Sequence, residues 1–463
     1  MSLKSQIDLN KDLLRKYSVS IPRYTSYPTA PEWTESFTRE NLLNAINLSN
    51  EKKSPISLYF HLPFCESQCY FCACNIVISK KRGITGSYLP YIKKEIVNSS
   101  KLVNKNRTVK QIHLGGGTPT YFEPAELVDF FDSVKSNYNL SKDCEIGIEV
   151  DPRVTSIEHL KALSKLGFNR LSMGIQDFNL KVQESVNRIQ PYENTNEIFK
   201  YARALGFESI NVDLIYGLPY QTKETFSKTI ELVLKLNPDR IALFHYAHLP
   251  ELINHQAKYI ASETLPDSNT KIEIFQHAVQ ALTDNGYMFI GLDHFAKAND
   301  ELALARKNKT LHRNFQGYTT KAECDLFGFG ITAISNIQNS FSQNIKKLNP
   351  YYEALDLDKT PVFRGIILNN DDLLRREIIM KILCHGLIKK SEFEQQYNIK
   401  FDSYFEEEIN KLNELKKDNL VNLDNDTIEV TDIGQFFLRN IACVFDYYLQ
   451  RKNGKQKIYS KSV

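Results

Sequence analysis

The sequence lacks the features that would mark a membrane, secreted or nucleic-acid-binding protein. Its 463 residues contain no run of about 18 apolar residues, so we expect no membrane-spanning helix. The amino terminus has no apolar core followed by small residues, which favours a cytoplasmic protein over a secreted one. The formal net charge is only +3, and we therefore expect no nucleic acid among its partners.

Cysteine is scarce outside one short segment. Four of the eight cysteines lie between Cys65 and Cys74, whereas a disulfide framework would spread them along the chain. No second pair follows at zinc-finger spacing, which disfavours a structural zinc module. The other four are expected to be buried structural thiols: Cys144, Cys324, Cys384 and Cys443.

From residue 56 to about 295, short segments rich in β-branched and aromatic residues alternate with segments of helical period. The predicted strands are 56–62, 111–115, 145–151, 170–175, 210–217 and 240–247. The predicted helices lie near 87–103, 124–137, 156–166, 180–205, 222–236 and 268–285. Such alternation implies parallel strands with right-handed crossovers, and six units favour an α/β fold with a partial (β/α)6 barrel.

The chain is expected to have three parts. They are an N-terminal extension (1–55), the partial barrel with an extension (56–345) and a small, mostly helical C-terminal domain (346–463). Three prolines exclude a helix over 21–31, and 296–345 is expected to be irregular. In the last part, a two-stranded hairpin is expected around 420–431.

Unusual residues gather where the predicted strands end. In strand order they are the cysteines, the run Gly115–Gly117, Glu149 with Asp151, Gln176 with Asp177, Asp213, and His245. Because the carboxyl ends of parallel strands meet at one edge, we expect the functional site there.

The cysteine segment reads HLPFCESQCYFCACN, with the spacing C-x3-C-x2-C-x-C. Thiolates are soft ligands suited to zinc or iron–sulfur clusters. We interpret Cys65, Cys69 and Cys72 as ligands of a cubane cluster in which one iron stays open for another ligand. Cys74 lies too close to Cys72 for both to reach one cubane. It is interpreted as a thiol near the substrate, or alternatively as a packing residue under the loop.

C-x3-C-x2-C after the first strand of a partial (β/α)6 barrel resembles the signature of radical S-adenosylmethionine (SAM) enzymes. Within them, the chain closely resembles the oxygen-independent coproporphyrinogen III oxidases from residue 23 to about residue 450. The segments that carry this resemblance include YFHLPFCESQCYFCACN, HLGGGTPTYF, IEVDPR, RLSMGIQDF, NVDLIYGLP and LHRNFQGYTT.

The resemblance implies a [4Fe–4S] cluster and two SAM molecules in each active site. It implies that a 5′-deoxyadenosyl radical starts the oxidative decarboxylation of two propionates of coproporphyrinogen III to vinyl groups. The product would be protoporphyrinogen IX, an intermediate of haem biosynthesis.

The same resemblance implies the roles of residues around the first SAM. Tyr59 and Cys74 are expected to be catalytic, with Tyr59 beside the cofactor, while Glu149 accepts hydrogen bonds and Ile334 touches the molecule. The turn that meets the methionine amino group is Gly115, Gly116, Gly117 and Thr118. Taken alone, the residues leave simpler interpretations open. Tyr59 could be an ordinary strand aromatic, the glycine run could be only a tight turn, and Glu149 could be a surface carboxylate.

The residues implied to surround the second SAM are Phe71, Gln176, Arg188, Asp213 and Ala247. Arg188 could pair with a carboxylate in a two-pronged bond, or occupy a solvated helix position. Asp213 lies in an otherwise apolar strand and needs a partner, which sequence alone leaves open as a ligand or a structural group.

The implied partners are coproporphyrinogen III, an electron donor and an electron acceptor of unknown identity, and we expect a monomer. The anionic substrate should meet basic side chains such as Arg23 or Arg313. The rival hypothesis is a haem-trafficking chaperone of the same superfamily. Those relatives generally lack both the RYTSYPT segment and a cysteine matching Cys74, and both are present here.

Overall fold

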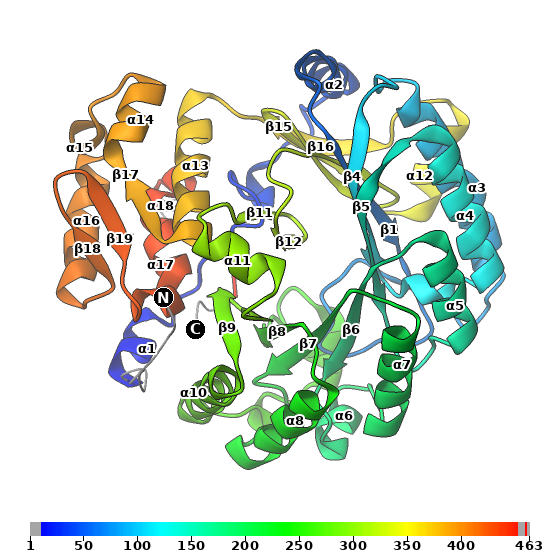
Figure 1. The fold of residues 1–463 in the computed structure, drawn as a ribbon, viewed down its shortest axis with the longest axis horizontal. Helices are drawn as coiled ribbons and strands as arrows, with labels where there is room; N and C mark the ends of the chain where they lie inside the picture. Colours follow the sequence, from blue (N-terminus) through cyan, green and yellow to red (C-terminus); the bar gives the residue numbers. More distant parts are fainter. Residues whose placement is uncertain (1–10, 452–458, 461–463) are drawn as a thin grey trace.

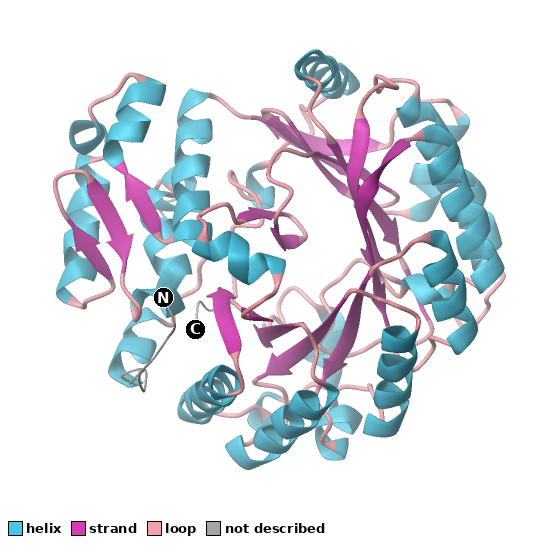
Figure 2. Cartoon of the chain, viewed as in Figure 1, coloured by secondary structure: helices cyan, strands magenta, loops and turns pink. Residues whose placement is uncertain are grey.

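The computed structural model describes residues 11–451 and 459–460. A single 12-stranded sheet curves through the larger part of the molecule, and helices cover its outer side (Figures 1 and 2). A smaller part, built from the C-terminal residues, lies beside it (Figure 1). In the described part of the chain, no helix is both long and apolar enough to cross a bilayer.

The six predicted strands are confirmed. They are β1 (Ile56–Leu62), β4 (Thr108–Gly116), β5 (Asn139–Val150), β6 (Arg170–Gln176), β7 (Ser209–Tyr216) and β8 (Arg240–His245). Each pairs in parallel with the next, so their carboxyl ends share one edge. The predicted α/β barrel fold is therefore confirmed.

The prediction of an irregular segment over 296–345 is wrong. β13 (Asp325–Phe329) pairs in parallel with β1 and adds a seventh strand to the parallel set. Three antiparallel strands extend the sheet beyond it: β14 (Ile334–Ile337), β15 (Ser340–Asn344) and β16 (Val362–Ile367). At the other end, β10 (His294–Lys297) and β9 (Tyr287–Gly291) follow β8. Along the chain, three short elements lie between β10 and β13: α11 (Glu301–Lys307), β11 (His312–Asn314) and β12 (Gly317–Thr319).

The seven main helices of the barrel are α3 (Ile84–Ser100), α4 (Pro124–Asn137), α5 (Ile157–Leu166), α6 (Leu180–Ser185), α7 (Tyr192–Ala204), α8 (Lys223–Leu236) and α10 (Ser268–Asp284). Five of the seven begin at a side-chain cap, and α3 and α7 are the exceptions. α8, for example, starts at a capping box between Thr222 and Thr225. The predicted single helix over 180–205 is wrong, because Pro191 ends the intervening loop and α7 starts after it.

Side chains along β6 and β7 alternate between two environments, whereas every residue of β1 is buried. In β6, Leu171, Met173 and Ile175 are buried under the helices, whereas Ser172 and Gln176 on the inner face are only half-buried. Strands buried on both faces would be apolar throughout. The alternation therefore leaves a polar inner face, and the candidate functional side chains lie on it.

The N-terminal extension links the barrel to the C-terminal part. It holds α1 (Lys11–Tyr17) and α2 (Arg39–Lys52), and the irregular segment between them includes a 3-10 turn at Ala30–Glu32. Within that segment, the Tyr24 hydroxyl donates to Asp446 (3.0 Å), and the Arg439 Nε donates to the Pro22 carbonyl (3.1 Å). Residues 1–10 of the predicted extension lie outside the described residues.

The C-terminal part is mostly helical, as predicted. Its helices are α13 (Asn370–His385), α14 (Lys390–Tyr397), α15 (Phe401–Tyr404), α16 (Glu406–Lys417), α17 (Leu438–Ala442) and α18 (Tyr447–Gln450). The predicted hairpin is confirmed as β18 (Val421–Leu423) and β19 (Thr427–Val430), and the unforeseen β17 (Leu387–Lys389) pairs with β19. The domain limits at 55/56 and 345/346 remain predictions, and β16 of the large sheet lies beyond the second of them.

Candidate active site

The cysteine loop starts and ends in a short parallel pair, β2 (Phe64–Cys65) and β3 (Val77–Ile78). The Val77 amide donates to the Pro63 carbonyl (2.8 Å), and the Ser79 amide donates to the Cys65 carbonyl (3.0 Å). Because β2 follows directly on β1, the loop lies at the carboxyl edge of the barrel, where the strand order predicts a site.

Each of the three predicted ligand thiols has at least one close polar contact. The Cys65 Sγ lies 3.4 Å from the Thr118 hydroxyl, and the Cys72 Sγ accepts from the Cys74 amide at 3.4 Å. The Cys69 Sγ accepts from the Arg153 Nη2 at 3.4 Å and from the Arg188 Nη1 at 3.6 Å. Hydrogen bonds to ligand sulfurs are how proteins orient and tune iron–sulfur clusters.

The thiols differ in their acidity. Burial raises the pKa of the Cys65 thiol to about 12, whereas a hydrogen bond with Cys74 lowers the pKa of Cys72 to about 7. Cys74 itself is exposed, which argues against the alternative of a packing residue under the loop.

The donor set fits an iron–sulfur cubane. A cubane takes each thiolate on a different iron, so three sulfurs from one loop, each with a protein hydrogen-bond contact, match its needs. Within residues 11–451 and 459–460, no three His, Cys, Asp or Glu side chains come close enough to hold a single metal ion. A cubane is larger than one ion and does not require that convergence.

Backbone contacts hold the first half of the cysteine loop from one side. The Tyr70 amide donates to the Val186 carbonyl (2.9 Å), and the Asn187 Nδ2 donates to the Gln68 carbonyl (2.8 Å). Both partners lie in the loop between α6 and α7 that also carries Arg188.

A short helix, α9 (Asn254–Tyr259), holds the second half of the loop. The His255 Nε2 bonds the Cys72 carbonyl at 2.7 Å. The buried Gln256 Nε2 donates to the carbonyls of Phe71 (3.2 Å) and Ala247 (3.3 Å). Phe71 and Ala247, both predicted for the second SAM, are thus brought together by one side chain.

The glycine run permits a close backbone approach. Gly116 has a φ of +109°, and a Cβ there would lie 2.6 Å from the His61 ring. A Cβ on Gly117 would lie 2.6 Å from the Pro63 carbonyl carbon. Next to it, the Thr118 amide donates to the Phe64 carbonyl (2.8 Å). The turn is therefore packed directly against the start of the cysteine loop, and larger residues would separate the two.

Tyr59 and Glu149 lie on the inner face next to this turn. The Tyr59 hydroxyl lies 3.1 Å from the His61 Nδ1, and burial raises its pKa, so the phenol stays protonated. The Glu149 carboxylate accepts from the Gly116 amide (3.2 Å) and lies 3.3 Å from the His113 Nε2. Although burial opposes ionisation, these contacts lower the pKa of Glu149 below its usual value.

A charged cluster lies behind Cys69. The Asp151 carboxylate pairs with the guanidinium groups of Arg153 (2.6 Å) and Arg188 (3.0 Å). Burial opposes its ionisation, but the two arginines prevail and lower the pKa of Asp151 to about 2. The Arg188 Nη2 also donates to the Gly174 carbonyl (2.6 Å), so Arg188 is fixed and not a solvated helix residue.

Gln176 and Asp213 complete the inner face. Gln176 has a φ of +69°, and its buried Oε1 has no hydrogen-bond partner in the described part of the chain. Asp213 accepts from the Asn211 Nδ2 (2.8 Å) and lies 3.4 Å from the Ser172 hydroxyl. These contacts answer its need for a partner. Burial and the charge of Glu149 nevertheless raise the pKa of Asp213 to about 7.

Three predicted residues lie apart from these contacts. Ile334 is buried in an apolar cluster with Trp33, Phe341 and Leu368. Arg23 pairs with Asp293 (2.5 Å). Arg313 is buried, and its Nη1 donates to the Tyr24 carbonyl at 2.7 Å. In this structure Arg313 therefore binds the N-terminal segment, and this contact does not fit the prediction that Arg313 contacts the substrate.

Sequence reasoning missed Arg153, His255 and Gln256. Arg153 lies two residues after the third predicted strand, so the strand-edge pattern could have found it. α9 was not predicted at all, and nothing in its sequence signals that two of its side chains hold the cysteine loop.

The comparisons with known proteins agree with this geometry. A family model described as "Radical SAM superfamily" matches residues 59–233, and another described as "HemN C-terminal domain" matches residues 368–437. The chain is thus a radical SAM enzyme.

Closely similar relatives narrow the class. The oxygen-independent coproporphyrinogen III oxidase of Synechocystis is 44% identical over 99% of this chain and 98% of its own length. The enzyme of that name from Escherichia coli is 44% identical over 98% of both chains. A solved structure, coproporphyrinogen III oxidase (HemN) from Escherichia coli, superposes with a TM-score of 0.91 at 43% identity, covering 96% of this chain and 100% of that one. The chain belongs to the oxygen-independent coproporphyrinogen III oxidase family.

Proposed function

We propose that this chain converts two propionate side chains of coproporphyrinogen III to vinyl groups without oxygen, giving protoporphyrinogen IX in haem biosynthesis. The observation that carries the proposal is the set of three hydrogen-bonded thiols, Cys65, Cys69 and Cys72, at the carboxyl edge of a polar-lined barrel. Family membership supplies the substrate.

Cys65, Cys69 and Cys72 would hold a [4Fe–4S] cluster. A cluster held there would supply the single electron for reductive cleavage of SAM, which would give the radical that starts oxidation at a propionate β-carbon. The chain's own residues bind and orient the reactants. The glycine turn and Glu149 offer backbone and carboxylate contacts for a first SAM, with Tyr59 beside them as a protonated phenol. Cys74, exposed next to the ligands, is the proposed thiol on the substrate side.

A second SAM would lie beside the first. Arg188 and Gln176 flank Gly174, because a Cβ there would lie 3.0 Å from the Arg188 Nη2 and 2.8 Å from the Gln176 Nε2. The positive charge of Arg188 acts on Asp213 and lowers its pKa, against the effect of burial. Gln256 donates to the carbonyls of both Phe71 and Ala247 and so holds these two residues near each other. The buried and unpartnered Gln176 Oε1 supports a ligand at this position.

The test is an anaerobic assay of the reconstituted protein with SAM, dithionite, an electron acceptor and coproporphyrinogen III. Protoporphyrinogen and carbon dioxide should form in the parent and in Cys324→Ala, a matched control outside the site. Cys65→Ala should form neither. An intact cluster with no product would overturn the proposal, and stoichiometric haem binding in the same sample would favour the chaperone.

The number of SAM molecules is a separate measurement. Equilibrium dialysis of the anaerobic holoprotein should show two equivalents bound per chain, and Asp213→Asn should lose the weaker one. A single equivalent in the parent would contradict the second site. Sedimentation of the same sample tests the expected monomer.

A further inference from the structure

The ring of His294 has no hydrogen-bond partner among the described residues. Seven of the ten histidines in the chain are bonded through a ring nitrogen: His61, His113, His159, His248, His255, His277 and His385. The Nδ1 of His294 is buried, and the half-buried ring leaves Nε2 as the accessible nitrogen. A polar ring that no contact within the protein satisfies is a candidate for a contact with a ligand.

Strand register places His294 on the wall of the barrel that carries Asp213. His294 is the partner of Ala242 in the antiparallel pair of β10 and β8, and Ala242 is the partner of Asp213 in the parallel pair of β8 and β7. Paired residues of neighbouring strands point to the same face of a sheet. His294 therefore faces the barrel interior at the level of Asp213, two strands away from it.

The hairpin of β11 and β12 connects His294 to the side of the site that carries Tyr59. This hairpin lies inside the curve of the sheet (Figure 1). The Tyr318 ring packs edge-on against His294 with centroids 5.3 Å apart, and the Phe315 ring packs in the same way against Tyr59 at 5.9 Å. Phe315 and Tyr318 are three positions apart, so their Cα atoms are separated by at most about 11 Å. His294 and Tyr59 therefore line one interior.

The charge around His294 favours an anion. The charged groups that act on its ring are three arginines and one acid: Arg23, Arg240, Arg313 and Asp293. Arg23 is paired with Asp293 (2.5 Å), and Arg240 is paired with Asp300 (2.9 Å). The buried Arg313 donates to two backbone carbonyls and forms no ion pair with a described carboxylate. The positive charge near His294 therefore exceeds the negative charge by that of Arg313.

The ring of His294 offers one hydrogen-bond donor. Burial lowers the pKa of His294 to about 4, so the ring is neutral and carries a single proton at physiological pH. A buried N–H group without an acceptor is rarer in proteins than a buried lone pair without a donor, which favours the tautomer with the proton on Nε2. An accessible N–H group in a positive field is suited to bind a carboxylate oxygen.

We propose that the Nε2 of His294 donates a hydrogen bond to a propionate carboxylate of the tetrapyrrole substrate. The inference rests on the proposed function and names a binding residue for it. His294 takes no part in the oxidation itself. The contact orients the macrocycle, because a carboxylate held at this wall restricts which propionates can face the cysteine loop.

The test measures binding of coproporphyrin III, the oxidised and unreactive form of the substrate, to the anaerobic holoprotein by equilibrium dialysis. His294→Phe keeps a ring that can pack on Phe244 and Tyr318 but removes both nitrogens. Its dissociation constant should be about tenfold higher than that of the parent. His294→Gln keeps an N–H donor and should recover most of the affinity. The matched control is His277→Phe on α10, which should bind as the parent does.

An ester and turnover give two further readouts. The tetramethyl ester of coproporphyrin III has no carboxylate, so His294→Phe should bind it as the parent does. In turnover with coproporphyrinogen III, His294→Phe should raise KM about tenfold and leave kcat within about twofold of the parent. Equal losses of affinity for the acid and the ester would overturn the inference, and so would a loss of kcat with an unchanged KM.

SAM binding and the parent protein separate this inference from the other proposals. His294→Phe should bind as many equivalents of SAM as the parent, and a lost equivalent would overturn the inference by placing His294 in a SAM site. An unchanged dissociation constant in His294→Phe, with normal conversion by the parent, would overturn the His294 contact alone. A parent that neither binds coproporphyrin III nor converts coproporphyrinogen III would overturn the proposed function itself.

Discussion

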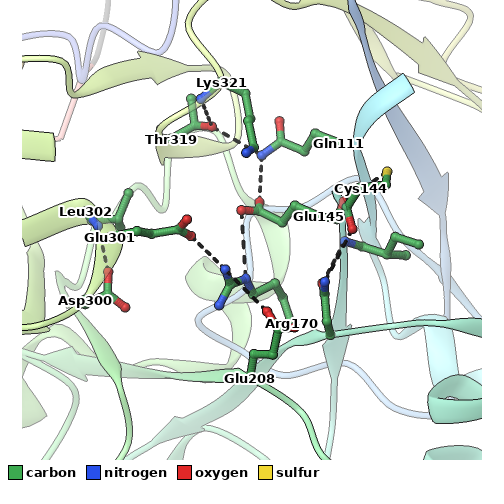
Figure 3. Close-up of polar contacts among 12 residues, drawn as sticks. Gln111, Cys144, Glu145, Arg170, Glu208, Asp300, Glu301, Leu302, Thr319 and Lys321 are labelled. Carbon is green, nitrogen blue, oxygen red and sulfur yellow. Dashed lines mark hydrogen bonds and ion pairs between the residues drawn. The ribbon is translucent and has the colours of Figure 1, made fainter. Parts of the chain in front are cut away.

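The two ends of the barrel's inner face are both polar, but they differ in how completely their charges are paired. At the amino-terminal end, Arg170 pairs with Glu301 at 3.0 Å and with Glu145 at 3.8 Å (Figure 3). Arg240 pairs with Asp300 at 2.9 Å, and the Gln111 Nε2 donates to Glu145 at 2.8 Å. Strand residues and the α11 segment thus bond each other at this end.

At the carboxyl-terminal end, several buried polar atoms have no protein partner in the described part of the chain. They are Gln176 Oε1, Arg188 Nε and His245 Nδ1. Asp213, in the same region, has a pKa raised to about 7 mainly by burial. Inward-facing polarity alone therefore does not mark the site. The Arg170 Nε at the amino-terminal end also lacks a hydrogen-bond partner among the described residues, so unpartnered atoms do not separate the two ends. What distinguishes the site is the buried carboxylate of Asp213, which forms no ion pair with a described basic side chain.

The largest expected effect comes from removing a ligand thiol at the site end. Cys69→Ala deletes the sulfur that accepts from Arg153 and Arg188. We expect iron and sulfide to fall to a small fraction of the parent content, and product to fall below detection. Iron and sulfide analysis after anaerobic reconstitution is the measurement, with Cys144→Ala as a matched control that keeps both. If Cys69→Ala kept the iron and sulfide content of the parent, the assignment of Cys69 as a ligand at the carboxyl-terminal end would be wrong.

Arg188→Ala should have the next largest effect. It leaves the buried Asp151 with only Arg153, and loss of one partner of a buried pair costs about 3 kcal/mol of unfolding free energy. Binding of the second SAM should also be lost. Denaturant unfolding of the apoprotein and dialysis of the holoprotein measure the two effects. Arg188→Lys, which keeps the charge but not the fork, should recover part of the stability. Unchanged stability in Arg188→Ala would show that the ion pair between Arg188 and Asp151 does not stabilise the fold.

The sequence was sufficient for six of the seven parallel strands, because each of the six is a short β-rich segment between segments of helical period. It was insufficient for β13–β16, because their burial comes from tertiary context. β15, for example, reads SFSQN and is mostly buried despite its polar sequence. The break at Pro191 was visible in the sequence, but a continuous helical period on both sides concealed it.

For the site, residue spacing identified the three ligand cysteines, and the resemblance supplied the SAM residues. Neither could reveal the contact between Arg153 and Cys69, since the two residues are 84 positions apart and meet only because β5 lies near β1 in the sheet. The roles of His255 and Gln256 likewise depend on the placement of α9, which no local pattern predicts.

A smaller effect is expected at the amino-terminal end. Arg170→Met removes a half-buried guanidinium and leaves Glu145 and Glu301 without it, while Arg240 still pairs with Glu301 (2.7 Å). We expect a loss of about 1–2 kcal/mol in unfolding free energy, with iron content and SAM binding unchanged. Thermal unfolding and SAM dialysis test both halves of this expectation. Loss of SAM binding in Arg170→Met would mean that the two ends are not functionally separate.

The last expected effect concerns pH, and it has opposite signs at the two ends. Because burial raises the pKa of Asp213 to about 7, folding takes up a proton between about pH 4 and 7, and stability falls as pH rises through that range. The unfolding free energy of Asp213→Asn should therefore match that of the parent apoprotein below about pH 4 and exceed it above about pH 7.

At Glu301, burial is outweighed by Arg170 and Arg240, which lower its pKa. Its contribution is present above its unfolded pKa and lost as pH falls, so Glu301→Gln should be less stable than the parent at neutral pH and converge with it in acid. Denaturant unfolding of the parent and both variants from about pH 2 to pH 8 gives the curves, and differences from the parent of the same sign would show that the ends do not differ in the pairing of their charges.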